Sequence, residues 1–185
     1  KLFIAANAYS GAKDVNFSIV RYGNVAGSRG SIIPFFKELI AKGEKELPIT
    51  DYRMTRFWIS LSEGVELVLK ALAEAKGGET FISKIPSFNV KDLAEAMCPG
   101  IKTVEVGIRP GEKLDEIMVT TEDAPFTYEY DKHFIVYPQV VFNERQVPDL
   151  SGKKVADGFY YSSGNNTEWM SVDEIRRRLP EAVDH

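Results

Sequence analysis

Apolar and polar positions along residues 17–24 follow the pattern of a buried strand in a parallel sheet. A glycine-containing loop comes next, and Ser31 can then cap a helix over residues 32–41. In α/β proteins, ligands often bind where a strand leads through such a loop into a helix, because the backbone N–H groups and the helix dipole favour anions. The pattern alone is equally consistent with an ordinary strand–loop–helix corner.

The clearest helix is predicted over residues 61–76, where apolar residues recur on one face and Gly77-Gly78 ends the helix. These apolar residues are Leu61, Val65, Val68, Leu69 and Leu72. We expect two shorter helices, one over 89–97 with Asn89 as its cap and one from Ser171 to Leu179. Ser171 and Glu174 form a capping-box pattern at the start of the second of these. Further strands are predicted at 47–50, within 51–60, at 80–83 and at 103–108.

Composition limits the possible functions of the 185-residue chain. Its net charge of −4 argues against a nucleic-acid partner held through phosphate contacts. One cysteine and two histidines allow neither an internal disulfide nor a Cys/His zinc site, so no metal site is predicted. The sequence contains no apolar run of membrane-spanning length. We therefore expect a soluble, cytoplasmic protein.

The first nine residues, KLFIAANAY, have helical spacing but no cap before them, and the chain begins at Lys1 without a methionine. They predict the last turns of a helix whose beginning lies upstream. The sequence has no dinucleotide-binding glycine fingerprint and no Walker loop. We interpret its two Tyr-x-x-x-Lys matches, Tyr9–Lys13 and Tyr128–Lys132, as coincidences. His133 is interpreted as a packed or surface residue.

Four arginines lie in loops that follow predicted strands, namely Arg29, Arg53, Arg56 and Arg109. Arg109 precedes a Pro-Gly turn, which limits its backbone freedom and suits bidentate binding of a diphosphate. Glu112 could accept both hydroxyls of a ribose. Any one of these arginines is more often a surface ion pair, but the four together predict an anionic ligand.

Four segments together resemble the extended short-chain dehydrogenase/reductase superfamily: RYGNVAGSRGS, PITDYRMTRFWIS, GGETFISKIPSF and IRPGEKLDE. Within it they resemble the inverting UDP-N-acetylglucosamine 4,6-dehydratases of bacterial pseudaminic acid synthesis. The resemblance runs from Lys1 to about Leu179. It implies the last strands and helices of a Rossmann-type α/β fold, together with a small α/β substrate-binding domain.

The resemblance also implies a reaction and a cofactor. Enzymes of this family use NADP to oxidise C4 of the sugar, eliminate water across C5–C6, and return the hydride to C6 with inversion at C5. Their acid/base residues lie upstream of the segment matching Lys1, so no catalytic residue is expected in this chain. We therefore expect this chain by itself to be inactive, to lack measurable NADP affinity, and to self-associate or fold poorly.

The resemblance assigns roles to six residues. It implies that Asn24 contacts the substrate diphosphate or sugar and that Glu112 binds the ribose. Arg56 and Arg109 would bind the diphosphate of UDP, and Val25 and Arg29 would face the cofactor. Residues 47–50 would offer backbone groups to the uracil. Asp115 stands where a histidine is expected; its charge should weaken nucleotide binding slightly.

The predicted domains are a remnant of the NADP-binding domain, residues 1–46 and 61–86, and a UDP-sugar-binding domain with a C-terminal extension, residues 47–60 and 87–185. The implied substrate is UDP-N-acetylglucosamine, and a homo-oligomer is expected. Two alternatives stay open. The chain could come from another nucleotide-sugar dehydratase or epimerase of the same superfamily, or it could be a non-catalytic UDP-sugar-binding fragment.

Overall fold

The computed structural model describes residues 2–9, 15–140 and 150–182, so Lys1 and Lys13 lie outside the described residues. The chain has a mixed α/β fold divided into two compact units. Unit 1 consists of Lys1–Tyr22, Ser62–Lys84 and Met118–Tyr161, and unit 2 consists of Gly23–Leu61, Ile85–Ile117 and Ser162–His185.

These units have different bounds from the predicted domains. Residues 23–46 belong to unit 2, and residues 118–161 belong to unit 1. The second difference arises because strands from the later segment pair with a strand near residue 80, which the sequence pattern of either segment does not reveal. The assignment of cofactor and substrate binding to separate domains stays a prediction.

Unit 1 is built on a five-stranded sheet with the order β1-β4-β9-β8-β10. Its strands are β1 (Ile19–Arg21), β4 (Thr80–Ser83), β9 (His133–Val136), β8 (Thr127–Glu129) and β10 (Lys153–Lys154). β1 and β4 are parallel, and the other neighbours are antiparallel. β1 is shorter than the predicted strand over 17–24 and only half-buried, because it has a partner on one side alone in this sheet.

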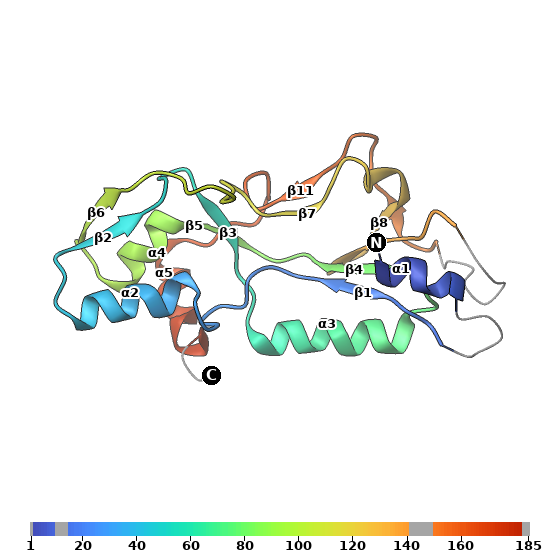
Figure 1. The fold of residues 1–185 in the computed structure, drawn as a ribbon, viewed down its shortest axis with the longest axis horizontal. Coiled ribbons are helices and arrows are strands. Elements are labelled where there is room, and N and C mark those ends of the chain that lie inside the picture. The colour runs from blue at the N-terminus through green and yellow to red at the C-terminus, as the bar shows by residue number, and fades with distance from the viewer. Residues whose placement is uncertain (1, 10–14, 141–149, 183–185) are drawn as a thin grey trace. The chain divides into compact units, whose positions relative to one another are not determined.

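Helix α3 (Leu61–Glu74) lies along β1 and β4 (Figure 1). Leu67 and Ala71 pack against Phe81 and Ile135 of the sheet and against Tyr137, which follows β9. The five apolar residues that predicted this helix are all exposed, with Leu69 at 58% and Leu72 at 80%. The helix therefore exists as predicted, but a neighbouring face that contains Gly64 and Ala71 packs on the sheet.

The N-terminal residues are helical as predicted, in α1 (Leu2–Ala6) and a 3₁₀ turn (Asn7–Tyr9).

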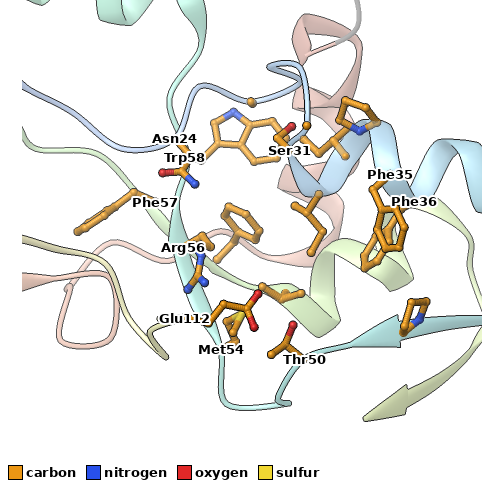
Figure 2. Close-up of a pocket in the computed structure, with 18 of the residues that line it drawn as sticks. Asn24, Ser31, Phe35, Phe36, Thr50, Met54, Arg56, Phe57, Trp58 and Glu112 are labelled. Carbon is orange, nitrogen blue, oxygen red and sulfur yellow. The ribbon is translucent and has the colours of Figure 1, made fainter. Parts of the chain in front are cut away.

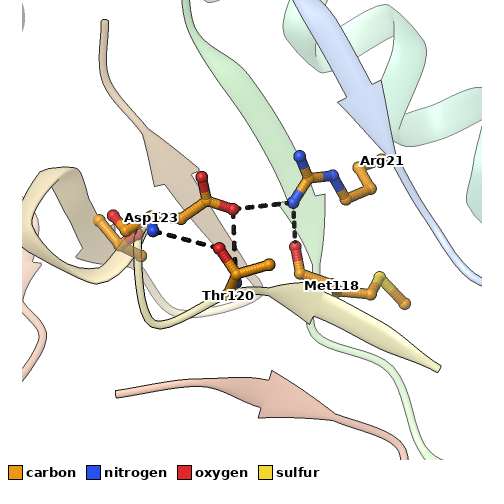
Figure 3. Close-up of polar contacts among 5 residues, drawn as sticks. Arg21, Met118, Thr120 and Asp123 are labelled. Carbon is orange, nitrogen blue, oxygen red and sulfur yellow. Dashed lines mark hydrogen bonds and ion pairs between the residues drawn. The ribbon is translucent and has the colours of Figure 1, made fainter. Parts of the chain in front are cut away.

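Arg21, at the end of β1, makes polar contacts with a distant segment of unit 1 (Figure 3). Its guanidinium donates to the Met118 carbonyl and pairs with Asp123 at 3.1 Å. The Asp123 carboxylate also accepts from the Thr120 backbone N–H, so the contact joins β1 to the turn before a 3₁₀ helix (Ala124–Phe126).

The described part of unit 2 contains two strand pairs and three α-helices. β2 (Glu46–Ile49) runs parallel to β6 (Lys102–Glu105), and β3 (Thr55–Phe57) runs antiparallel to β5 (Ser87–Asn89). The helices are α2 (Ile32–Ala41), α4 (Val90–Met97) and α5 (Val172–Arg178), which continues into a 3₁₀ turn (Leu179–Ala182). A hydrophobic cluster in this unit includes the fully buried side chains of Phe36, Leu47, Ile49, Trp58, Leu93 and Ile175.

A further pair of strands, β7 (Ile117–Val119) and β11 (Tyr161–Ser162), includes residues at which the chain passes between the units.

In the described ranges, no helix has the length and apolar character that crossing a membrane requires.

Two predicted helix caps in unit 2 are confirmed, and one is wrong in part. The Asn89 side chain accepts from the Lys91 backbone N–H, and Ser171 forms the full capping box with Glu174. Ser31 does precede α2 in an extended conformation, but its side chain makes no capping hydrogen bond.

Candidate functional site

A pocket of about 580 Å³ lies within unit 2. It is lined by the loop before α2, the first turn of α2, and residues from β2, β3, β5 and the segment after β6. All four predicted substrate residues line it, namely Asn24, Arg56, Arg109 and Glu112. They come from three segments that are far apart in the sequence, and the fold of unit 2 brings them to one cavity.

Charged and aromatic side chains both line the pocket. Arg56 and Glu112 lie on one side, and Phe35 and Phe36 of α2 lie on the opposite side (Figure 2). Thr50, from the segment predicted to contact uracil, also lines the pocket. The cavity therefore suits a ligand with a charged part and a flat or apolar part.

Arg56 lies within β3 rather than in a loop, so the predicted loop position is wrong for this residue. Its side chain is only 15% exposed. Nη1 donates to the Thr55 carbonyl at 2.6 Å and to the Leu114 carbonyl at 2.9 Å, and Nε lies 3.5 Å from Oε1 of Glu116. These contacts orient the guanidinium beside the pocket and reduce the entropy that binding would cost.

Arg109 and Glu112 belong to a tight turn at the pocket's edge. The Glu112 N–H donates to the Arg109 carbonyl, and the Arg109 N–H donates to Oε2 of Glu112, both at 3.0 Å. Gly111 in this turn has a φ of +87°, which favours glycine. Across the described residues, the exposed Arg109 side chain has no ion-pair partner, so it is not held in a structural ion pair.

The other two candidate arginines do not line the pocket. Arg53 binds Asp51 through two bonds, Nε–Oδ1 at 3.0 Å and Nη2–Oδ2 at 2.7 Å. Hydrogen bonds from the Arg53 side chain, and then from its backbone, lower the pKa of Asp51 to about 2. Arg29 is exposed and lies outside the lining, whereas Val25, the other predicted cofactor residue, is part of it.

Trp58 and Ser31 also line the pocket, although the sequence pattern does not predict either as a site residue. Trp58 is 1% exposed and packs edge-on against Phe88, with ring centroids 5.6 Å apart. Within the ranges that the structure describes, neither Trp58 Nε1 nor Ser31 Oγ has a hydrogen-bond partner, although both atoms are buried. The MTRFWIS segment contains Trp58, but its pattern does not show which of these side chains faces the cavity.

A second cavity, of about 340 Å³, lies within unit 1 and contains none of the predicted site residues. His133 is buried there and stacks on Tyr130 and Phe81, with centroid distances of 4.9 and 6.4 Å. Burial lowers the pKa of His133, and the Lys70 charge acts in the same direction. The prediction that His133 is a packed or surface residue is confirmed, in its packed form.

Comparison with known proteins identifies the family. Residues 1–138 match the profile of the family described as "Polysaccharide biosynthesis protein". The chain belongs to this family. The resemblance stated from the sequence is confirmed by two relatives in this comparison, both "UDP-N-acetylglucosamine 4,6-dehydratase (inverting)" of Campylobacter jejuni subsp. jejuni strains.

One of these family relatives, from C. jejuni serotype O:23/36 (strain 81-176), is 50% identical over 182 residues, which is 95% of this chain and 54% of the relative. A "UDP-glucose 4-epimerase" of Rickettsia akari is 40% identical over 184 residues, or 97% of this chain and 53% of the relative. The chain thus spans about half the length of the curated relatives it matches.

Among solved structures, Pen from Bacillus thuringiensis is similar with a TM-score of 0.80 and 34% identity. The similarity covers 97% of this chain and 53% of Pen. It confirms the predicted fold class, the C-terminal part of an extended short-chain dehydrogenase/reductase fold.

Proposed function

We propose that this chain forms the UDP-sugar-binding part of a C5-inverting UDP-N-acetylglucosamine 4,6-dehydratase. One observation carries the proposal: Asn24, Arg56, Arg109 and Glu112, predicted from separate sequence segments, line a single pocket. The 50% identity to the inverting dehydratase of C. jejuni supports the substrate. The product would be the 4-keto-6-deoxy sugar nucleotide that enters pseudaminic acid synthesis.

The contacts support a specific role for each residue in binding one part of the ligand. Arg56 and Arg109 would hold the diphosphate, since both are cations at the pocket and Arg109 has its guanidinium exposed. Glu112 would bind the ribose with Oε1, while Oε2 accepts from the Arg109 backbone. Thr50 lies where the predicted uracil-binding segment meets the cavity.

Two residues of this chain could reach an NADP molecule. Val25 lines the pocket, and Arg29 offers an exposed cation next to it in the same loop. Both fit a contact at the edge of a cofactor site, and the sequence has no glycine fingerprint that would bind the pyrophosphate. The cofactor would supply hydride transfer at C4 and C6. We assign no catalytic acid or base to this chain.

Titration calorimetry with UDP and UDP-N-acetylglucosamine tests the proposal on matched variants of neighbouring arginines. Arg56→Ala should weaken the binding of both ligands by about tenfold or more, because a charge-assisted contact contributes about 1.5–3 kcal/mol. Arg53→Ala is the control, since Arg53 is paired with Asp51 and does not line the pocket. Equal affinities in wild type and Arg56→Ala would contradict the proposed site.

The isolated 185-residue chain should form no 4-keto-6-deoxy product and bind no NADP. Product formed by the purified chain would disprove this part of the proposal. We further propose that the full natural protein is cytoplasmic and homo-oligomeric. Cell fractionation tests its location, and size-exclusion chromatography with light scattering tests its oligomeric state.

The similarity to the R. akari protein supports a second candidate, a nucleotide-sugar epimerase. Product analysis of the full natural protein distinguishes the two. Loss of water and inversion at C5 indicate the dehydratase, whereas an unchanged mass with inversion at C4 indicates the epimerase. Nucleotide-sugar binding with neither product would indicate a non-catalytic binding module.

A further inference from the structure

Three polar side chains meet beside Arg56 in unit 2, from segments far apart in the sequence. Thr55 Oγ1 lies 2.6 Å from Oδ1 of Asp115 and 2.7 Å from Oγ of Ser163. Thr55 and Ser163 are buried, and Asp115 is half-buried. None of the three lines the pocket. Asp115 also stands where the resemblance to the family predicts a histidine.

The hydrogen bonds of this group have one consistent direction. Thr55 donates its single hydroxyl proton to Oδ1 of Asp115. Ser163 must then donate its own proton to Thr55 Oγ1. The Ser163 oxygen in turn accepts from the Glu116 backbone N–H at 2.9 Å. Donors and acceptors therefore form an ordered series that ends at the Asp115 carboxylate.

This series holds the segment 114–116 against β3. The Ser163 N–H donates to the Glu116 carbonyl at 2.8 Å, which ties the segment on its other side. The Leu114 carbonyl accepts from both the Thr55 N–H, at 3.0 Å, and Arg56 Nη1, at 2.9 Å. The contact that orients the Arg56 guanidinium thus depends on the position of residues 114 and 115.

Gly164 leaves room for the Asp115 carboxylate in this position. A Cβ atom on residue 164 would lie 2.5 Å from Oδ2 of Asp115, so a side chain there would force the carboxylate to shift. The carboxylate therefore lies between Thr55 and Gly164.

We propose that Asp115 is a positioning residue that orients Arg56 for the diphosphate of a bound nucleotide. The inference rests on the proposed function, in which Arg56 binds that diphosphate. Asp115 acts through Thr55 and the Leu114 carbonyl and does not touch the ligand. If Asp115 acted only through its negative charge, removing the carboxylate would increase nucleotide affinity, because a carboxylate repels a nearby diphosphate. The positioning role predicts a decrease in affinity instead.

UDP affinity measured by calorimetry on the full natural protein tests this inference. Asp115→Ala should weaken UDP binding about tenfold, and Thr55→Val, which removes the hydroxyl, should do the same. Asp115→Asn should restore most of the affinity, because its amide oxygen can still accept from Thr55. Glu44→Gln is the charge control: it removes an exposed carboxylate of unit 2 outside the pocket and should not change UDP affinity.

A double-mutant cycle distinguishes positioning from a general loss of structure. In the Arg56→Ala background, Asp115→Ala should cause no further loss of UDP affinity, because the guanidinium that Asp115 positions is absent. Additive losses, or tighter binding by Asp115→Ala alone, would overturn the inference and leave the proposed function standing. Unchanged affinity in Arg56→Ala alone would overturn both. Melting curves of all variants accompany the titrations.

Discussion

Arg109 and Glu112 hold one turn together through two hydrogen bonds, each 3.0 Å long, between the Arg109 N–H and the Glu112 carboxylate and between the Glu112 N–H and the Arg109 carbonyl. The backbone of Arg109 is thereby tied down while its side chain stays exposed. The Arg109 backbone is held by hydrogen bonds, and its guanidinium has no ion-pair partner among the described residues. This arrangement suits the binding of an anionic ligand.

Arg109→Ala should therefore weaken UDP binding by about ten- to a few hundred-fold, because a bidentate guanidinium can make two charge-assisted bonds. Arg109→Lys should recover only part of the loss, since an ammonium cannot make the forked contact. Calorimetry with UDP measures both, and the melting temperature should barely change. A lower melting temperature with unchanged UDP affinity would contradict the binding role.

Two leucines of α3 offer a matched test of which helix face supports unit 1. Leu67→Ala should lower the free energy of unfolding by about 2–4 kcal/mol, because Leu67 packs against the sheet. Leu69→Ala should change it by about 0.5 kcal/mol or less, because Leu69 is 58% exposed. Urea unfolding of both variants provides the comparison. The reverse order would show that the face suggested by the sequence pattern is the packed one after all.

The ion pair between Asp51 and Arg53 should make stability depend on acid pH. The folded-state pKa of Asp51 is about 2, below the value of about 3.9 for an unfolded chain. The resulting stabilisation is present above the unfolded value and is lost as pH falls from about 4 through about 2. Melting temperatures across this range should fall less steeply in Asp51→Asn and in Arg53→Ala than in wild type. Parallel curves for all three proteins would refute the assignment.

His133 should produce a second pH dependence, at higher pH. Its folded pKa is lowered by burial, with charges from Lys70, Glu74, Lys84 and Asp131 acting on it. The folded state thus prefers the neutral ring, so stability is full above the unfolded pKa of about 6.5 and falls as pH drops below it. His133→Phe keeps an aromatic ring and should flatten the melting temperature between pH 7 and 5. An unchanged slope would count against a buried neutral histidine.

Local features of the sequence were sufficient for several elements. Helix α2 has the predicted bounds of residues 32–41, and the capping box of Ser171 with Glu174 starts α5. Such features depend on contacts between residues three or four positions apart, which the chain encodes directly. The family resemblance carried by short motifs predicts Asn24, Arg56, Arg109 and Glu112 as site residues, and the fold brings all four to one pocket.

Other properties depended on what each element packs against. The apolar spacing of 61–76 predicted a helix, but the sheet packs against Leu67 and Ala71, which only the positions of Phe81 and Ile135 decide. Arg53 and Arg56 look alike in sequence, yet Asp51 pairs with the first and the Leu114 carbonyl orients the second beside the pocket.

The sequence by itself determined the helices, the turns and the residue types available for binding a nucleotide, because these follow from local periodicity and short motifs. Tertiary structure alone decided which helix face is buried, which arginine lines the pocket, and that Thr55 meets both Asp115 and Ser163. The two Thr55 contacts join residues 60 or more positions apart, and no local pattern along the chain specifies which distant segments come into contact.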